Sequence, residues 1–443
     1  MFTSLKTLFT TSLLILMLAS CGGGGDSTQP VQPPPPPPPA PTQQEQISEL
    51  WSSVIPNYME QVPWASNNIY DAGHVLMLPL DYAFSPNGSV QMQNDFHALF
   101  SDYLAVFDES IEPNILSRFQ FLYLATRYLN LVQPNGFNQE QKALYDKILS
   151  HLELVFFEQS ARYAFNNIGT LEEVVQTKLD LVTEPVSKLR RVTVDLEFHV
   201  FAIAGEFAAM QRRIDGDVSQ RIQRILDLSY DTFQSEVVYT DSGWLYQPGF
   251  WENYVDYQFA GHSIIQENLA PLPVAGIATD SSHSHRMPLW LLSMAKAYPE
   301  GNDRREYFES LSDGFEEQFM TVVYRAPTSD FPAPRMTNYM DGHNGLYRYN
   351  ADNPEPIKLA YEAFNLSGTL LISFFPYMYN DELASAYENL AFPLQENVAD
   401  LYVGLGPSLD PTASAITLPA YHENGFAEMN ALIASLMVSE VVQ

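Results

Sequence analysis

The stretch VDLEFHVFAIAGEFAAMQRR, residues 194–213, decides the kind of fold that this chain forms. Its large apolar side chains, Phe198, Phe201, Ile203 and Phe207, recur at the spacing of an α-helix. A helix this apolar must be covered by neighbouring elements. His199 lies among these residues, and we interpret it as a core histidine and not as a ligand. The stretch therefore predicts a helix that packs inside a helical core.

The same periodicity continues on both sides of this stretch. Helical spacing of apolar residues is found in segments 115–132, 139–165, 171–189, 218–233, 288–298, 304–323, 358–377, 382–390 and 424–438. No series of alternating β-branched strands accompanies them. Helical hairpins that cannot each bury an apolar face must stack on their neighbours. The sequence therefore predicts an all-α fold.

Two arrangements of stacked helical hairpins suit a chain of this length, a closed (α/α) toroid and an open solenoid. No fixed repeat of about 34 to 45 residues is visible, which argues against TPR or HEAT repeats. Three long segments without a helical pattern, residues 69–93, 235–285 and 326–357, are typical of functional loops. We therefore expect an (α/α) toroid with long aromatic-rich loops over residues 45–443.

The first 20 residues have the pattern of a signal peptide. Lys6 provides a positive charge, and an apolar run from Leu8 to Met17 follows it. This run is too short to span a bilayer. The small residues Ala19 and Ser20 then precede Cys21, the only cysteine of the chain. The pattern predicts export, with cleavage close to Cys21.

The residues Leu18-Ala19-Ser20-Cys21 resemble the lipobox of bacterial lipoproteins. The resemblance implies cleavage before Cys21, lipidation of its thiol by groups such as palmitate, and a lipid-anchored protein of the cell envelope. Gly22, and not Asp, follows the cysteine, which by analogy with enterobacterial lipoproteins favours the outer membrane. The alternative is an ordinary secretory signal with a chance cysteine.

Residues 21–44 have the composition of a tether. Gly22 to Gly25 is flexible, and the seven prolines from Pro33 to Pro39 favour a stiff polyproline II rod of roughly 20 Å. The segment is too poor in apolar residues to build a core. We expect it to hold the folded domain away from the lipid surface.

The charge balance limits the partners of the protein. The chain has 22 Lys and Arg against 53 Asp and Glu, a formal net charge of −31. Such a surface repels phosphate backbones, so we expect no nucleic-acid partner. No loop with the EF-hand ligand pattern accounts for the carboxylates.

The three predicted loops combine aromatic residues with Asp, Asn, His and Arg. Flat aromatic faces stack on the C–H faces of sugar rings, and short polar groups hydrogen bond to their hydroxyls. The candidate substrate-binding residues are Trp244, Trp251, Tyr254, His262, Arg335 and Arg348. The alternative for each aromatic residue is that it caps the helical core. For the group as a whole we favour carbohydrate binding.

In architecture and loop content the chain resembles the (α/α)-toroid polysaccharide lyases and related carbohydrate-active enzymes. The resemblance implies β-elimination in a uronate-containing polymer, with one group that neutralises the carboxylate and a His or Tyr that moves the C5 proton. The residues of the matching types are His283, His285, Arg286, His343, Asn344, Tyr257 and Tyr339. The implied partners are a polysaccharide substrate and, through Cys21, a lipid membrane.

Three alternatives remain open at this point. A glycoside hydrolase of the same class needs two carboxylates, for which Glu252, Asp256, Asp280 and Asp341 are candidates. A non-catalytic glycan-binding lipoprotein needs only the aromatic platforms. We expect no cofactor. The alternative is a divalent metal bound by Asp280, His283 and His285. If these residues lie on a strand, the rings of His283 and His285 share one face.

Overall fold

The computed structural model describes residues 40–60, 64, 69–107, 114–183, 188–349, 360–403 and 420–437. The predicted signal peptide, Cys21 and most of the tether lie outside this range. The unit that begins at Thr42 is mostly helical, which confirms the predicted all-α class. Its first helix, α1 (Gln43–Met59), starts at an N-cap formed by Thr42, whose side chain and that of Glu45 form a capping box.

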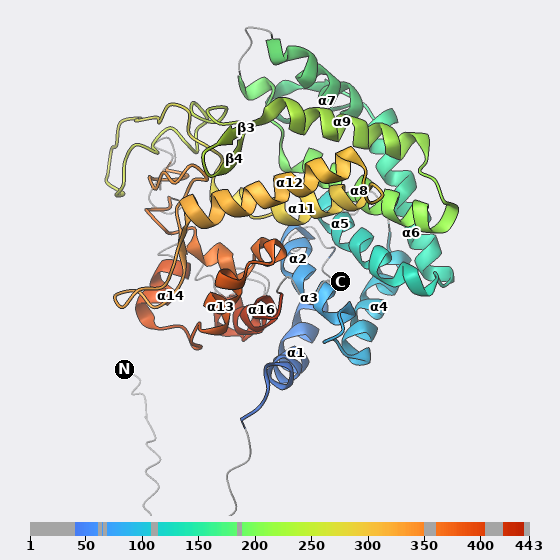
Figure 1. Ribbon diagram of the computed structural model, residues 1–443, viewed down its shortest axis with the longest axis horizontal. Helices are drawn as coiled ribbons and strands as arrows, with labels where there is room; N and C mark the ends of the chain where they lie inside the picture. The colour runs from blue at the N-terminus through green and yellow to red at the C-terminus, as the bar shows by residue number, and fades with distance from the viewer. Residues whose placement is uncertain are drawn as a thin grey trace, which may run out of the picture. The chain divides into compact units, whose positions relative to one another are not determined.

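Three apolar helices lie side by side in the core: α5 (Ile115–Val132), α8 (Asp195–Asp215) and α11 (Met287–Lys296). Helix α8 packs against both of the others, and Figure 1 shows the three near the centre of the domain. Helix α8 is buried without interruption from Leu196 to Gln211. Gly205 permits the close contact with α11, because a Cβ atom there would lie 2.4 Å from the carbonyl oxygen of Ser293. The apolar stretch quoted first is thus a central helix of the fold.

A second set of helices covers α5, α8 and α11. Helix α6 (Gln139–Glu153) packs on α5, α9 (Gln220–Glu236) on α8, and α12 (Asp303–Gln318) on α11. Helix α7 (Leu171–Asp180) packs on α9. Each of these helices is amphipathic; α9, for example, buries Ile222, Ile225 and Phe233 on one face. Each apolar helix is therefore covered by the α-helix that follows it in the chain.

The remaining helices bring the two ends of the domain together. Helix α16 (Phe426–Ser435) packs against α1, α3 (Met77–Phe84) and α13 (Asp381–Glu388). Helix α2 (Ile69–Val75) packs on α5. The other helices are α4 (Val90–Ala105), α10 (Ser281–Ser284), α14 (Glu396–Val403) and α15 (Ala420–Glu423). No helix of the described residues is both long and apolar enough to cross a membrane.

The strands of the described residues form three short antiparallel pairs. They pair β1 (Ala161–Arg162) with β2 (Ile168–Gly169), β3 (Val237–Thr240) with β4 (Gly243–Tyr246), and β5 (Tyr324–Arg325) with β6 (Arg335–Met336). In the longest of them Tyr239 lies opposite Trp244. Each pair is a separate two-stranded sheet, and the core of the domain is formed by helices.

Several predicted boundaries were wrong. Residues 69–93, expected to be a loop, form α2, α3 and the start of α4. Pro79 lies in the first turn of α3, where the missing N–H has no helical acceptor, so it does not break the helix. Segments 139–165 and 171–189 end as α-helices at Glu153 and Asp180.

The predicted helix over residues 358–377 was also wrong in its described part. Between residues 360 and 378 the helical structure is limited to two short 3₁₀ turns, Ser367–Leu371 and Phe375–Met378. Pro376 and Gly368 both disfavour a continuous α-helix there. The two other predicted loops are irregular in their described parts, apart from the end of α9 and the elements β3, β4, α10 and β6.

Candidate active site

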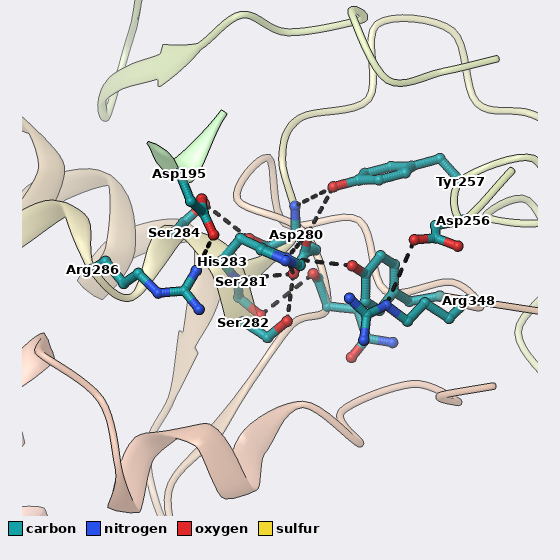
Figure 2. A network of polar contacts seen from close by, with 12 residues as sticks. Asp195, Asp256, Tyr257, Asp280, Ser281, Ser282, His283, Ser284, Arg286 and Arg348 are labelled. Carbon is teal, nitrogen blue, oxygen red and sulfur yellow. Dashed lines mark hydrogen bonds and ion pairs between the residues drawn. The ribbon is translucent and has the colours of Figure 1, made fainter. Parts of the chain in front are cut away.

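The first residues of α5, α8 and α11 meet the loop after β4 around one cavity of about 460 Å³. Seven residues singled out in the sequence line it: Trp251, Tyr254, Asp256, Tyr257, Asp280, His283 and Arg348. They come from segments more than 90 residues apart, and Figure 2 shows five of them converging on α10. A cavity of this volume lies in the usual range for small-molecule sites.

Asp280 is the most heavily hydrogen-bonded group of the cavity. It is the N-cap of α10, and its carboxylate accepts hydrogen bonds from the backbone N–H of His283 (3.0 Å), the Ser282 hydroxyl (2.5 Å) and the Tyr257 hydroxyl (2.7 Å). Burial alone would raise its pKa, but the charge and hydrogen bonds of His283 and the two hydroxyl donors hold the pKa well below its usual range. Asp280 is therefore a fixed anion.

His283 is oriented by that anion. Its Nδ1 lies 2.8 Å from Oδ2 of Asp280 and, since the carboxylate can only accept, Nδ1 carries the proton. Nε2 is then the basic nitrogen of the neutral ring, and none of the described residues hydrogen bonds to it. The side chain is 31% exposed, so the ring reaches the cavity. Burial lowers the pKa of His283, but Asp280 outweighs this effect and raises it above the ordinary value.

Arg348 supplies positive charge in the same cavity. Its backbone has a left-handed φ of +58°, and its guanidinium lies 5.2 Å from the ring centre of Tyr347. The ion pair with Asp256 is long, at 3.6 Å from Nε, and the Arg348 side chain is 43% exposed. Most of its N–H donors are therefore available to a carboxylate ligand. Burial raises the pKa of Asp256.

Four aromatic side chains form a platform. Trp251 stacks on Tyr257 with ring centres 5.7 Å apart and an angle of 15° between the planes. Phe165 and Tyr254 meet Trp251 edge-on. The hydroxyl of Tyr254 has no hydrogen-bond partner in the described part of the chain, and burial raises its pKa. This arrangement offers a ring face and a proton donor to one ligand.

A second polar layer lies behind the cavity. Arg286 donates from Nη1 to Asp195 at 2.7 Å and from Nε to His74. Asp195, the first residue of α8, lines the cavity, whereas the Arg286 side chain is only 3% exposed. His285 is buried beside His74 and Phe374, and its Nδ1 accepts the backbone N–H of Phe374. The predicted catalytic residues His285 and Arg286 therefore support the wall and do not line the cavity.

Two further predicted aromatic residues belong to the core. Trp244 is buried and donates from Nε1 to the carbonyl oxygen of Leu311 at 2.7 Å. Tyr339 is buried and donates its hydroxyl to the carbonyl oxygen of Leu346. Neither lines the cavity. For Trp244 and Tyr339, the alternative that an aromatic residue caps the helical core is therefore the correct one.

The polar residues predicted around 341–344 stabilise loops. His343 places Nε2 at 2.7 Å from the carbonyl oxygen of Ala260. The side-chain oxygen of Asn344 accepts backbone N–H groups from Asn338 and Phe364. Asp341 accepts the backbone N–H groups of Ala278 and His343.

The other three predicted residues also lie away from the cavity. Arg335 lies between the rings of Phe331 and Phe364. His262 bonds through Nε2 to the carbonyl oxygen of Ala270, and Glu252 accepts the N–H of Gly276. None of the three lines the cavity.

The possible metal site at Asp280, His283 and His285 does not assemble. The two histidines lie on and just after the helical turn α10, where residues two apart point about 200° away from each other. The expectation that they share one face of a strand was wrong. Within the described ranges, no group of three or more His, Cys, Asp or Glu side chains is arranged to hold a metal ion.

Sequence reasoning missed several lining residues. Arg162, Tyr163 and Phe165 come from the β1–β2 hairpin, while Asp195 and Trp290 come from the first turns of α8 and α11. Arg162 is exposed and forms no ion pair with any described residue. The segments that carry them have no unusual composition, so only the tertiary structure identifies them.

Comparison with protein-family models, curated proteins and solved structures found no significant match to this chain.

Proposed function

We propose that the protein is a polysaccharide lyase of the cell envelope that cleaves an acidic, uronate-containing polysaccharide by β-elimination. The observation that carries the proposal is the Asp280–His283 pair, whose free Nε2 belongs to the same cavity as Arg348 and the aromatic platform. A base near neutral pKa, a cation and a ring-stacking surface are the groups that this reaction requires.

Each group has a role in the proposed reaction. Arg348, with Arg162 beside the same cavity, binds the uronate carboxylate and stabilises the charge that develops when C5 loses its proton. Nε2 of His283 takes that proton. The C5–H electron pair forms the C4–C5 double bond as the C4–O bond breaks. The leaving oxygen takes a proton from the hydroxyl of Tyr254, which is restored from solvent.

The helix packing supports an (α/α) toroid as the finer architecture. Helices α5, α8 and α11 each contribute their first residues to one cavity, so they run in the same direction, and α6, α9 and α12 return on their outer sides. Contacts of α16 with α1 and α3 bring the last hairpins beside the first. Neighbouring inner helices with their N-terminal ends together are what a ring of hairpins requires.

Attachment to the outer membrane through Cys21 is part of the proposal and rests on the sequence. Metabolic labelling with a fatty acid tests it: the wild-type chain should incorporate the label, and Cys21→Ala should not. Incorporation into Cys21→Ala would overturn lipidation at this residue.

The enzymatic test uses the domain from Thr42 onward with a panel of acidic polysaccharides. A lyase produces an unsaturated uronate, seen as a rise in ultraviolet absorbance together with new reducing ends. Binding without either signal would instead support the glycan-binding alternative and overturn the lyase proposal.

A glycoside hydrolase is the second candidate, and the position of Asp256 favours it. Burial raises the pKa of this carboxyl group, as a general acid requires, and Asp195 lines the same cavity as a possible second carboxylate. New reducing ends without ultraviolet absorbance would identify this reaction.

A further inference from the structure

Two hydrogen-bond donors at the cavity have no acceptor. The indole Nε1 of Trp290 and the hydroxyl of Tyr163 are buried, and neither has a hydrogen-bond partner in the described part of the chain. An indole N–H can only donate. A buried donor without a partner costs about 1–3 kcal/mol, so such groups are rare unless a ligand or water satisfies them. Both side chains line the cavity that holds His283 and Arg348.

Apolar side chains line the same cavity as these donors. Leu116 at the start of α5, Leu196 at the start of α8 and Met287 on α11 line the same cavity. Met287 precedes Trp290 by three residues, which places both on one face of α11. Two other phenol groups of the cavity are already engaged, since Tyr246 donates to Thr193 and Tyr257 to Asp280. The cavity therefore combines two neutral donors that have no partner with several apolar side chains.

This combination matches one chemical group better than others. A sugar hydroxyl has no apolar part to place against Leu116 and Met287. A carboxylate is better served by Arg348, whose guanidinium lies in the same cavity. An acetyl group presents a neutral carbonyl acceptor and a methyl group on adjacent atoms, and so uses both features at once.

We propose that this cavity binds an acetyl substituent of the sugar, with the carbonyl oxygen accepting from Trp290 and Tyr163 and the methyl group against Leu116 and Met287. The proposal deepens the proposed function and rests on it: the acidic polysaccharide is an acetylated one. The acetyl group can be linked as an amide or as an ester. Both linkages present the same carbonyl and methyl groups.

The test observes the donor directly. In the full-length protein labelled with ¹⁵N, the indole N–H signals of the five tryptophans are followed while sugars are added. The probes are N-acetylglucosamine (amide), 6-O-acetylglucose (ester) and glucose (no acetyl group). These monosaccharides are not cleaved by elimination, so the result is independent of the lyase reaction. Assignment comes from Trp290→Phe and Trp244→Phe.

We expect one or both acetylated sugars to shift the Trp290 signal downfield and glucose to leave it in place. Trp244 donates to Leu311 away from the cavity, so its signal is the internal control. Trp290→Phe retains an aromatic ring and removes the donor, and should weaken binding of the acetylated sugar roughly three- to tenfold without changing glucose binding. Tyr163→Phe, at a less buried position, provides a second variant if Trp290→Phe does not fold.

Two outcomes overturn the acetyl proposal. One is equal binding of acetylated sugars and glucose with no movement of the Trp290 signal. The other is a Trp290 signal that responds to His199→Gln and not to sugars, because Nε2 of His199 is also buried without a partner and the two rings lie 5.1 Å apart. Acetyl-dependent binding with no elimination product from any polymer would overturn the lyase reaction alone.

Discussion

Asp280 holds His283 at two points: its carboxylate accepts both the backbone N–H and the ring Nδ1–H of the same residue. Asp280 is the N-cap of α10 and His283 follows it by three positions, so the cap that starts the helix also fixes the tautomer of the histidine. The ring is thereby presented to the cavity through Nε2, and the proposed chemistry depends on this relationship.

Replacement of His283 tests the proposed base. We expect His283→Gln to lower kcat about 10²- to 10⁴-fold on the acidic polymer with little effect on binding, because a positioned general base contributes that much. His262→Gln is the matched control, since His262 is half-buried, bonds to the carbonyl oxygen of Ala270 and does not line the cavity. Equal activity of the two variants would exclude His283 as the base.

The pH profile follows from the Asp280–His283 pair. Because the pKa of His283 is raised, the base is protonated and inactive at low pH, and kcat/KM should rise through an apparent pKa above the ordinary histidine value. Asp280→Asn removes the charge that raises the pKa, so the rise should move to lower pH while maximal activity falls. A rise that stays at the same pH in Asp280→Asn would show that another group controls the profile.

Arg348 is expected to select acidic ligands. Arg348→Gln should weaken binding of a uronate oligosaccharide about 10- to 100-fold, because a charge-assisted hydrogen bond contributes about 1.5–3 kcal/mol. Arg335→Gln is the control, since that guanidinium lies between Phe331 and Phe364 outside the cavity. Isothermal titration calorimetry distinguishes them, and equal losses would contradict the assignment.

Asp71 on α2 should make stability depend on pH. Burial raises its pKa to about 6, although the charge of Arg286 opposes this. A carboxyl whose pKa is raised by folding stabilises the protein fully below its unfolded value, near 4, and loses that contribution as pH rises through about 6. Relative to wild type, Asp71→Asn should therefore gain thermal stability between pH 4 and pH 7.5.

Thermal unfolding of both proteins at each pH measures this effect, and the difference at pH 4 is the baseline. A difference in Tm that is constant with pH would show that Asp71 does not titrate in this range.

Gly205 tests the packing of α8 on α11. A Cβ atom at this position would lie 2.4 Å from the carbonyl oxygen of Ser293, so Gly205→Ala must separate the two helices. We expect a loss of about 1–3 kcal/mol in the free energy of unfolding, measured by denaturant titration. Unchanged stability would mean that the helices lie farther apart than described.

The helical core was predictable because it depends on local periodicity. The apolar residues of 194–213 recur every three to four positions, and α8 buries them as expected. The same reasoning failed at 69–93, a segment that contains Gly73 and Pro79 and was expected to be a loop. Gly73 instead lies within α2 where a Cβ would be 2.8 Å from Gln120, and Pro79 lies where a helix tolerates it.

The sequence predicted which types of residue line the candidate site, but not which individual residues do so. The sequence identified aromatic, acidic and basic residues in the segment after β4, and Trp251, Tyr254, His283 and Arg348 do line one cavity. It gave no means of separating Trp251 from Trp244, because both have the same local setting and differ only in which helices cover them.

By itself the sequence determined the all-α class, because helical periodicity and caps are local properties of the chain. Only the tertiary structure decided that His283 reaches the cavity while His285, two residues later, is buried beside His74. Successive helical residues turn by about 100°, so the choice depends on which wall each ring meets. Those walls come from α5, α8 and the β1–β2 hairpin, far away in sequence.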